Sequence, residues 1–172
     1  AAERDEDAAA DADLTAQLPT TQRFTIVHGD YRLDNTMLHP TQVGRINAVL
    51  DWEMSTLGDP LADLGILCTY WAQQSDPDLR KRGAPVGAVT SLPGFLTREQ
   101  VASGYADRTG LDVSVLPWYV SFGFFKLAVV CAGIAMRVRF GAMVGEGFDG
   151  FEERVPPLIE IGRATLTDQK LY

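Results

Sequence analysis

Histidine and cysteine are scarce in this sequence, which limits the metal sites and cross-links that the chain could form. There are two histidines, His28 and His39, and two cysteines, Cys68 and Cys131. The histidines lack the spacing of a zinc site, which disfavours an aspartate-based metal hydrolase. Both cysteines have apolar sequence neighbours, so we expect two buried free thiols and no disulfide.

Clusters of basic residues are also lacking. The formal net charge is −8, and the longest basic run is Arg80-Lys81-Arg82. Proteins that bind nucleic acids usually show a basic patch, so we expect no nucleic-acid partner. The acidic balance is compatible with a cationic substrate or a metal–nucleotide complex and requires neither.

An uncharged run long enough to cross a membrane is lacking as well. Residues 113–136 are largely apolar, but Pro117 lies near their start and Lys126 near their middle. A central lysine costs about 2.5–3.5 kcal/mol on insertion, so we expect a buried or amphipathic helix and no membrane partner. No basic region followed by an apolar stretch marks a signal peptide near residue 1, so we expect a cytoplasmic protein.

The residues that are present predict short strands followed by helices. Strands are expected at 24–27, 36–39 and 46–50, with 37–50 as a hairpin and no clear strand signal after Asp51. Helices are expected from the cap Asp59-Pro60, from the capping box 97–100 to about Gly110, over 117–140, and from 152 or 157 to 166. Residues 73–92 are predicted to form a loop. Residues 1–22 are expected to be an acidic, Ala-rich helix or tail. The remainder, 23–172, is predicted to be one mainly helical α+β domain.

Three oxygen-bearing side chains follow the predicted strands. Asp30 and Asn35 occupy the loop after the first strand, and Asp51 ends the hairpin. We therefore expect them to converge at one end of a small sheet. Mg²⁺ usually takes one or two carboxylates plus substrate phosphates. Asn35 and Asp51 are the candidate metal ligands, which leaves Asp30 free to accept a hydrogen bond from an incoming hydroxyl.

This set has the parts that phosphoryl transfer requires. The transition state is loose, so the protein mainly positions groups and neutralises charge. Asp30 would orient and deprotonate the acceptor, while Asn35 and Asp51 would hold Mg²⁺ against the phosphates. Taken singly, each of the three residues could equally be a turn former or a cap. As a matched set they favour the functional interpretation.

The same residues resemble a known family. His28-Gly29-Asp30 followed by Asn35, with a later hairpin Asp51, resembles the signature of the aminoglycoside phosphotransferases, which are similar to choline kinases and more distantly to protein kinases. The blocks 49–53 and 57–64 resemble the family's second motif. The stretch 125–137 resembles the subgroup associated with acyl-CoA dehydrogenases. The resemblance covers residues 18–166, nearly the whole chain.

The resemblance implies the C-terminal lobe of a protein kinase-like fold, with a small hairpin region at the active site. It implies ATP or GTP as phosphoryl donor, Mg²⁺ as cofactor and a small-molecule hydroxyl as acceptor. Asp30 maps to the catalytic base, and Asn35 and Asp51 map to the metal ligands. The acceptor stays open between an aminoglycoside, which the acidic chain suits, and a hydroxylated acyl compound, which the subgroup suggests.

Neighbouring polar residues have supporting roles in this interpretation. His28 and Asp63 resemble the family's braces of the catalytic loop, and Asp59 is expected mainly as a helix cap. Arg32 is expected either to bind the nucleotide phosphates or to pair with a surface carboxylate. Asp34 is a less well-placed candidate for the base.

Glycine and lysine are missing from the part of the chain before the motif. The first glycine is Gly29 and the first lysine is Lys81. A kinase-like N-terminal lobe needs a glycine-containing loop over the phosphates and a strand lysine. We therefore expect these residues to provide the C-terminal lobe alone, with little activity by itself. The alternative is a non-catalytic module for protein interaction or self-association, such as a homodimer.

Overall fold

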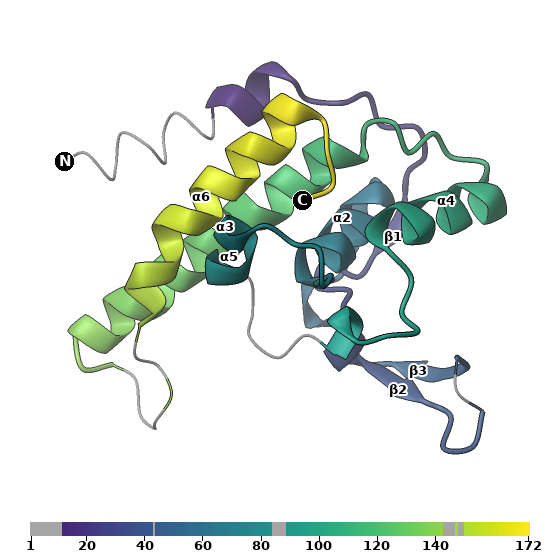
Figure 1. Cartoon of the computed structure of the whole chain (residues 1–172), viewed down its shortest axis with the longest axis horizontal. Coiled ribbons are helices and arrows are strands. Elements are labelled where there is room, and N and C mark those ends of the chain that lie inside the picture. Colours follow the sequence, from purple (N-terminus) through teal and green to yellow (C-terminus); the bar gives the residue numbers. More distant parts are fainter. Residues whose placement is uncertain (1–11, 43, 84–88, 143–146, 148–149) are drawn as a thin grey trace.

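The computed structural model describes residues 12–42, 44–83, 89–142, 147 and 150–172. Residues 1–11, half of the predicted acidic segment 1–22, lie outside the described residues. Residues 12–16 are helical. The chain then forms four short strands, followed by a cluster of helices (Figure 1). The mainly helical α+β class predicted from the sequence is confirmed.

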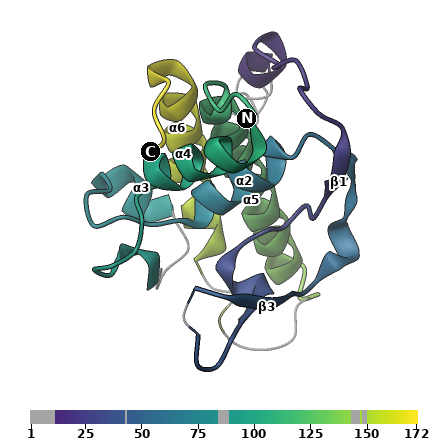
Figure 2. The ribbon, with the colours of Figure 1, turned by 90° about the vertical axis from the view of Figure 1, so that its right-hand side faces the viewer.

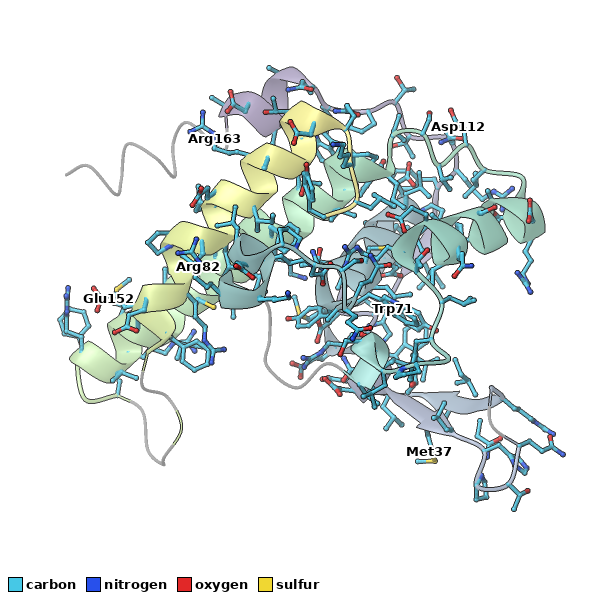
Figure 3. The ribbon with its side chains drawn as sticks, viewed as in Figure 1. Met37, Trp71, Arg82, Asp112, Glu152 and Arg163 are labelled. Atoms are coloured by element: carbon cyan, nitrogen blue, oxygen red, sulfur yellow. The ribbon has the colours of Figure 1, made fainter. Side chains whose placement is uncertain are left out.

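The four strands form two separate antiparallel ribbons. Strand β1 (Thr25–Val27) pairs with β4 (Thr56–Gly58), and β2 (Thr36–Leu38) pairs with β3 (Ile46–Val49). The predicted hairpin is therefore confirmed, and Met37 extends from it away from the helices (Figure 3). The expectation that strand structure fades after Asp51 is wrong, and so is the expectation of one small sheet. β4 is only three residues long, too short for a periodic pattern to reveal it.

Three helices build the core. Helix α5 (Leu116–Arg139) packs between α2 (Leu61–Tyr70) and α6 (Phe151–Asp168), and fully buried side chains such as Leu61, Phe124 and Leu158 fill the contact. Gly65 lets α2 approach α5 closely, since a Cβ there would lie 2.6 Å from Tyr119 Cβ. The helices form a scaffold on one side of the two ribbons (Figure 2).

The capping predictions hold at α4 (Arg98–Thr109). The Thr97 hydroxyl accepts a hydrogen bond from the Gln100 backbone N–H, and the Gln100 side-chain oxygen accepts one from the Thr97 N–H. Gly110 ends the helix with φ +72°. At α2 the helix begins one residue later than expected, at Leu61. The Asp59 carboxylate still accepts the Leu61 N–H at 2.9 Å.

The predicted loop 73–92 is partly wrong, because it contains helix α3 (Asp78–Gly83) and the short 3₁₀ turn Val89–Ser91. Arg80, which the sequence showed only as part of a basic run, is fully buried in α3. Helix α3 was not predicted because it is only 6 residues long and is flanked by proline, glycine and serine residues, which are typical of turns.

Helix α5 is long and apolar enough to cross a membrane, with a mean hydropathy of 1.8 over its most apolar window, of which 39% is buried. Its first half lies in the core, and its second half exposes Val129, Val130 and Met136. One helix of this kind is weak support for a span, because core helices share the same composition. The absence of a membrane partner stays a prediction.

The two cysteines are free thiols, as expected. Both are buried, and burial raises the pKa of the Cys68 thiol to about 12. Neither thiol is therefore in a setting that favours the reactive thiolate at neutral pH.

Candidate active site

The loop after β1 is held through its backbone N–H groups. Asp63, from the first turn of α2, accepts hydrogen bonds from the N–H groups of His28 at 2.7 Å and of Gly29 at 2.8 Å. Gly29 has φ +84°, and a Cβ there would lie 2.5 Å from the carbonyl oxygen of Met54. The loop thus needs glycine at this position and a carboxylate beneath it.

His28 is buried and joins the two ribbons. Its Nε2 lies 2.7 Å from the carbonyl oxygen of Leu50, and its Nδ1 accepts the N–H of Asp30 at 3.2 Å. These two contacts match the tautomer that carries its hydrogen on Nε2. Its ring packs against Trp52 with centroids 4.8 Å apart. With both nitrogens engaged, His28 has a positioning geometry and not that of a proton-transfer group.

Asp30 and Asn35 are in direct contact. The Nδ2 group of Asn35 donates to the Asp30 carbonyl at 2.8 Å and to Asp30 Oδ2 at 3.1 Å. These bonds use the donor end of the buried amide, so its oxygen, the end that ligates cations, is not used by them. The Asp30 carboxylate is about one-quarter exposed, with 23% of its side-chain surface accessible. It can therefore be reached by an acceptor.

Asp51 lies beside this pair through the hairpin backbone. The N–H of Leu50 donates to the carbonyl of Asn35 at 2.8 Å, which places Asp51 one residue beyond that contact. Asp51 is exposed and has left-handed backbone angles, φ 63° and ψ 57°. A non-glycine residue in this region is uncommon and clusters at functional sites. The exposed carboxylate of Asp51 and the amide oxygen of Asn35 are donors of the kind that Mg²⁺ takes together with phosphate oxygens.

No group of three or more His, Cys, Asp or Glu side chains gathers as a metal site within the described residues. The candidate Mg²⁺ ligands, Asn35 and Asp51, fall outside such a group because one of them is an amide. They fit a metal whose remaining ligands come from a bound nucleotide and water, and they do not form a closed protein site.

Arg32 lies against both carboxylates of the loop. Its Nε is 3.3 Å from Asp30 Oδ2, and a terminal nitrogen is 3.5 Å from the exposed Asp34. Its guanidinium also stacks over the ring of Tyr70, 4.9 Å from the centroid. Burial raises the pKa of Tyr70, with Arg32 acting in the opposite direction. Two hypotheses for Arg32 came from the sequence, a contact with the nucleotide phosphates and a pair with a surface carboxylate. Both stay open, because one of its two partners is the predicted base Asp30.

Asp59 lies apart from this loop. Its carboxylate accepts the N–H of Leu61 at 2.9 Å and of Gln22 at 3.3 Å. Burial raises the pKa of Tyr119, and a hydrogen bond to Asp59 raises it further. Asp59 is thus positioned as a cap of α2 that also ties the segment before β1 to the helices.

A groove of about 750 Å³ opens beside the loop after β1. It runs between the ribbons and α4, with α2 as its floor, and its loop end is marked by His28 and Tyr31. Apolar side chains dominate its walls: Ile26, Ile46, Val49, Trp52, Leu64, Leu67, Leu96 and Val101. Arg108 is the one cationic residue in the lining, and the carboxylate of Asp63 is already engaged by the loop.

Comparison with known proteins agrees with this geometry. Residues 1–85 match the model of the phosphotransferase enzyme family. A solved structure from Ralstonia eutropha JMP134, named as an aminoglycoside phosphotransferase, superposes with a TM-score of 0.76 and 31% identity over 95% of this chain.

Over residues 1–85 this chain matches the phosphotransferase enzyme family, and its fold is that of the solved phosphotransferase structure.

Its similarity to curated relatives confirms the predicted subgroup. The mouse acyl-CoA dehydrogenase family member 10 is 41% identical over 130 residues, 74% of this chain. The human acyl-CoA dehydrogenase family member 11 is 33% identical over 141 residues, 80% of this chain. This chain spans only 12% and 17% of these two relatives and 49% of the solved structure.

The phosphotransferase fold brings together the residues predicted for the site, and their chemical roles stay predictions. Asp30, Asn35 and Arg32 are in contact, Asp51 is adjacent through the backbone, and His28 and Asp63 hold the loop. Reasoning from the sequence missed the groove, because its lining joins segments as distant as Thr25 and Arg108, and hydrophobic periodicity carries no signal for such contacts. It also missed Tyr70, which lies only at the end of a predicted helix.

Proposed function

We propose that this chain supplies the catalytic base and metal ligands of an enzyme that transfers the γ-phosphoryl group of ATP or GTP to a hydroxyl of a small molecule. The observation that carries the proposal is the Asp30–Asn35 contact in a loop pinned by Asp63. It keeps the base carboxylate at a fixed place beside the candidate metal ligands. The match of residues 1–85 to the phosphotransferase enzyme family supports the reaction class.

In this proposal Asp30 accepts the hydroxyl proton of the acceptor as the acceptor oxygen bonds to the γ-phosphorus. The bond between that phosphorus and the bridging oxygen breaks, and the nucleoside diphosphate leaves. Mg²⁺ held by Asn35 and Asp51 would neutralise phosphate charge when bound. Arg32, which pairs with Asp30 in its resting arrangement, is positioned to transfer that contact to a phosphate oxygen.

The test is Asp30→Ala in the complete gene product. Loss of a general base lowers kcat on the order of 10²–10⁴-fold. Asp34→Ala is the matched control, because Asp34 has 80% of its side chain exposed and belongs to the same loop. Phosphoryl transfer, measured by the release of nucleoside diphosphate, should fall by that factor in the first variant and be kept in the second. Equal activity of Asp30→Ala and the unaltered protein would reject the assignment.

The 172 residues alone are proposed to bind Mg-ATP weakly and to turn over negligibly. They contain no glycine before Gly29 and no lysine before Lys81, so the usual phosphate-covering loop and strand lysine are not among them. Isothermal calorimetry of this polypeptide checks the point, and ordinary micromolar affinity would contradict it.

For the acceptor, we propose a hydroxylated acyl compound. The apolar walls of the groove suit a hydrocarbon chain better than a polycationic sugar, and Arg108 suits an anionic end group. The names of the mouse and human relatives point to the same chemical class. Assays of the complete gene product with hydroxyacyl acids, hydroxyacyl thioesters and an aminoglycoside compare the candidates. Turnover confined to the aminoglycoside would overturn this choice.

A second candidate function, self-association without catalysis, rests on one observation. Residues in strands β1 and β4, and Phe24 just before β1, expose large apolar side chains, with Phe24 71%, Ile26 67% and Leu57 64% accessible. Isolated exposed apolar residues are normal, but neighbouring ones mark contact surfaces. Sedimentation velocity of the chain tests this function independently of phosphoryl transfer.

A further inference from the structure

Lys126 occupies an unusual position for a charged residue. It lies near the middle of the apolar helix α5, one residue after the partly buried Phe125 and two before the buried Ala128. Its Nζ donates to the carbonyl oxygen of Gly29 at 2.5 Å, across 97 residues of sequence. The other two lysines of the chain, Lys81 and Lys170, are exposed. A helix from the core thus reaches the catalytic loop through this one ammonium group.

The peptide group between Gly29 and Asp30 is held at both ends. Its oxygen accepts from Lys126, and its N–H donates to Nδ1 of His28 at 3.2 Å. Asp63 holds the two preceding N–H groups from the other side of the loop. A peptide group is planar, so fixing both its oxygen and its hydrogen fixes the direction in which the chain enters Asp30. Lys126 therefore controls where the Asp30 carboxylate is presented.

The hydrogen bond from Lys126 to Gly29 has a charged donor, although a neutral donor would be enough for a purely structural role. Among the ion pairs found in the described residues, none involves Lys126. Hydrogen bonds from charged donors are stronger than neutral ones, and a half-buried ammonium without a carboxylate partner is costly to keep. Its retention in an apolar helix is explained by the loop that it holds.

We propose that Lys126 is a positioning residue for Asp30, fixing the Gly29–Asp30 peptide group so that the base meets the acceptor hydroxyl in a productive orientation. The proposal rests on the function proposed above for Asp30. It assigns no contact of Lys126 with substrate, so Lys126 acts through the loop alone.

The first test uses this chain and needs no activity. Amide hydrogen exchange of Asp30 is compared in the unaltered chain, in Lys126→Met, which keeps the apolar stem, and in the matched surface control Lys81→Met. Loss of a charged hydrogen bond should speed exchange at Asp30 on the order of 10-fold or more. Amides in the buried part of α5 should stay unchanged. Unchanged exchange at Asp30, or an equal increase throughout the fold, overturns the proposal.

The second test separates positioning from stability in the complete gene product. Lys126→Met should lower kcat on the order of 10-fold or more, while KM for the nucleotide stays within about 2-fold. Lys126→Arg, which keeps a charged donor, should recover a substantial part of kcat, and Lys81→Met should leave kcat unchanged. Should Lys126→Met not fold, Lys126→Gln replaces it. An unchanged kcat, or a loss that merely follows the folded fraction, overturns the proposal.

The two tests fail separately. If the unaltered gene product transfers no phosphate, the proposed function is rejected, and exchange at Asp30 still decides whether Lys126 fixes the loop. If phosphate is transferred and neither exchange nor kcat responds to Lys126→Met, the function stands and the positioning role is rejected.

Discussion

Gly29 is the residue at which the backbone of the candidate site is most constrained. With φ +84° and the Met54 carbonyl 2.5 Å from an added Cβ, both the backbone and the space exclude a side chain. Gly29→Ala should therefore destabilise the fold by about 1–3 kcal/mol, from left-handed strain plus a displaced η2 turn (Trp52–Met54). Urea denaturation followed by circular dichroism measures the change.

Gly133→Ala is the control for this prediction. Gly133 lies inside α5, and an added Cβ there meets nothing within 4 Å. The same substitution should stabilise the chain by about 0.5–1 kcal/mol, because alanine favours helices. Two variants that shift the denaturation midpoint in the same direction would contradict the assigned backbone roles.

Asp63 carries a second prediction at the residue scale. Its two carboxylate oxygens each accept one loop N–H, so Asp63→Asn replaces one acceptor by an NH₂ group facing an N–H. The unfolding free energy should fall by about 1–3 kcal/mol, the cost of an unmet bond to a charged group. Asp107→Asn, at an exposed position of α4, should change it by less than about 0.5 kcal/mol. Equal losses in the two variants would argue against the brace.

The residues of the motif could be predicted from the sequence because they lie close together in it. Asp30 and Asn35 are five positions apart, and Asp51 ends a hairpin that alternation and turn residues reveal. Lys126 and Tyr70 could not be predicted as neighbours of this loop, because their contacts depend on how α2 and α5 pack. Only tertiary structure brings a helix residue next to a loop 97 positions earlier.

At the scale of elements, three buried charges join α2, α3, α4 and the C-terminal segment. Asp76 accepts from Arg80 at 3.2 Å and from Arg98 at 2.5 Å. The two guanidinium groups also donate to the carbonyls at the end of α2 and to those of Leu171 and Tyr172. Burial and the nearby Arg98 lower the pKa of Arg80 to about 9, with Asp76 opposing them.

Asp76→Asn should cost about 3–5 kcal/mol of unfolding free energy, because it leaves two buried guanidinium groups without their counter-ion. Asp78→Asn is the matched control, two residues away on α3. Its side chain is 97% exposed and pairs with Lys81 at 3.8 Å, so the expected loss is below about 1 kcal/mol. Urea denaturation compares the variants, and a loss at Asp76 as small as that at Asp78 would show that the cluster is dispensable.

This cluster also shows where prediction of elements from the sequence reaches its limit. The long helices were predictable from capping residues and apolar length, as at α4 and α5. Helix α3 and strand β4 were not, since each is held by partners distant in sequence. Arg80 in a basic run has the composition of a surface residue, and only the fold reveals that Asp76 and backbone carbonyls enclose it.

At the scale of the whole molecule, the helices form one body and the ribbons present a second, more exposed surface beside it (Figure 2). Ile26 and Leu57 face each other across β1 and β4, and Phe24 lies two residues from Ile26 on the same face. Apolar walls of the groove belong to this surface too, so the surface that would bind an acceptor is continuous with one that could bind protein.

The exposed ribbon should make this polypeptide self-associate. Neighbouring apolar side chains on a short two-stranded ribbon are a typical contact surface, with unpaired strand edges to extend it. Sedimentation velocity at rising concentration should show a species larger than 18.8 kDa for the unaltered chain. Ile26→Lys should restore a monomer, because the lysine places a charge at the centre of the surface. Val129→Lys, at an exposed position in the far part of α5 (56% accessible), should not. A monomer at every concentration would leave phosphoryl transfer as the sole function that the fold supports. Association abolished only by Val129→Lys would move the contact surface to the α5–α6 pair.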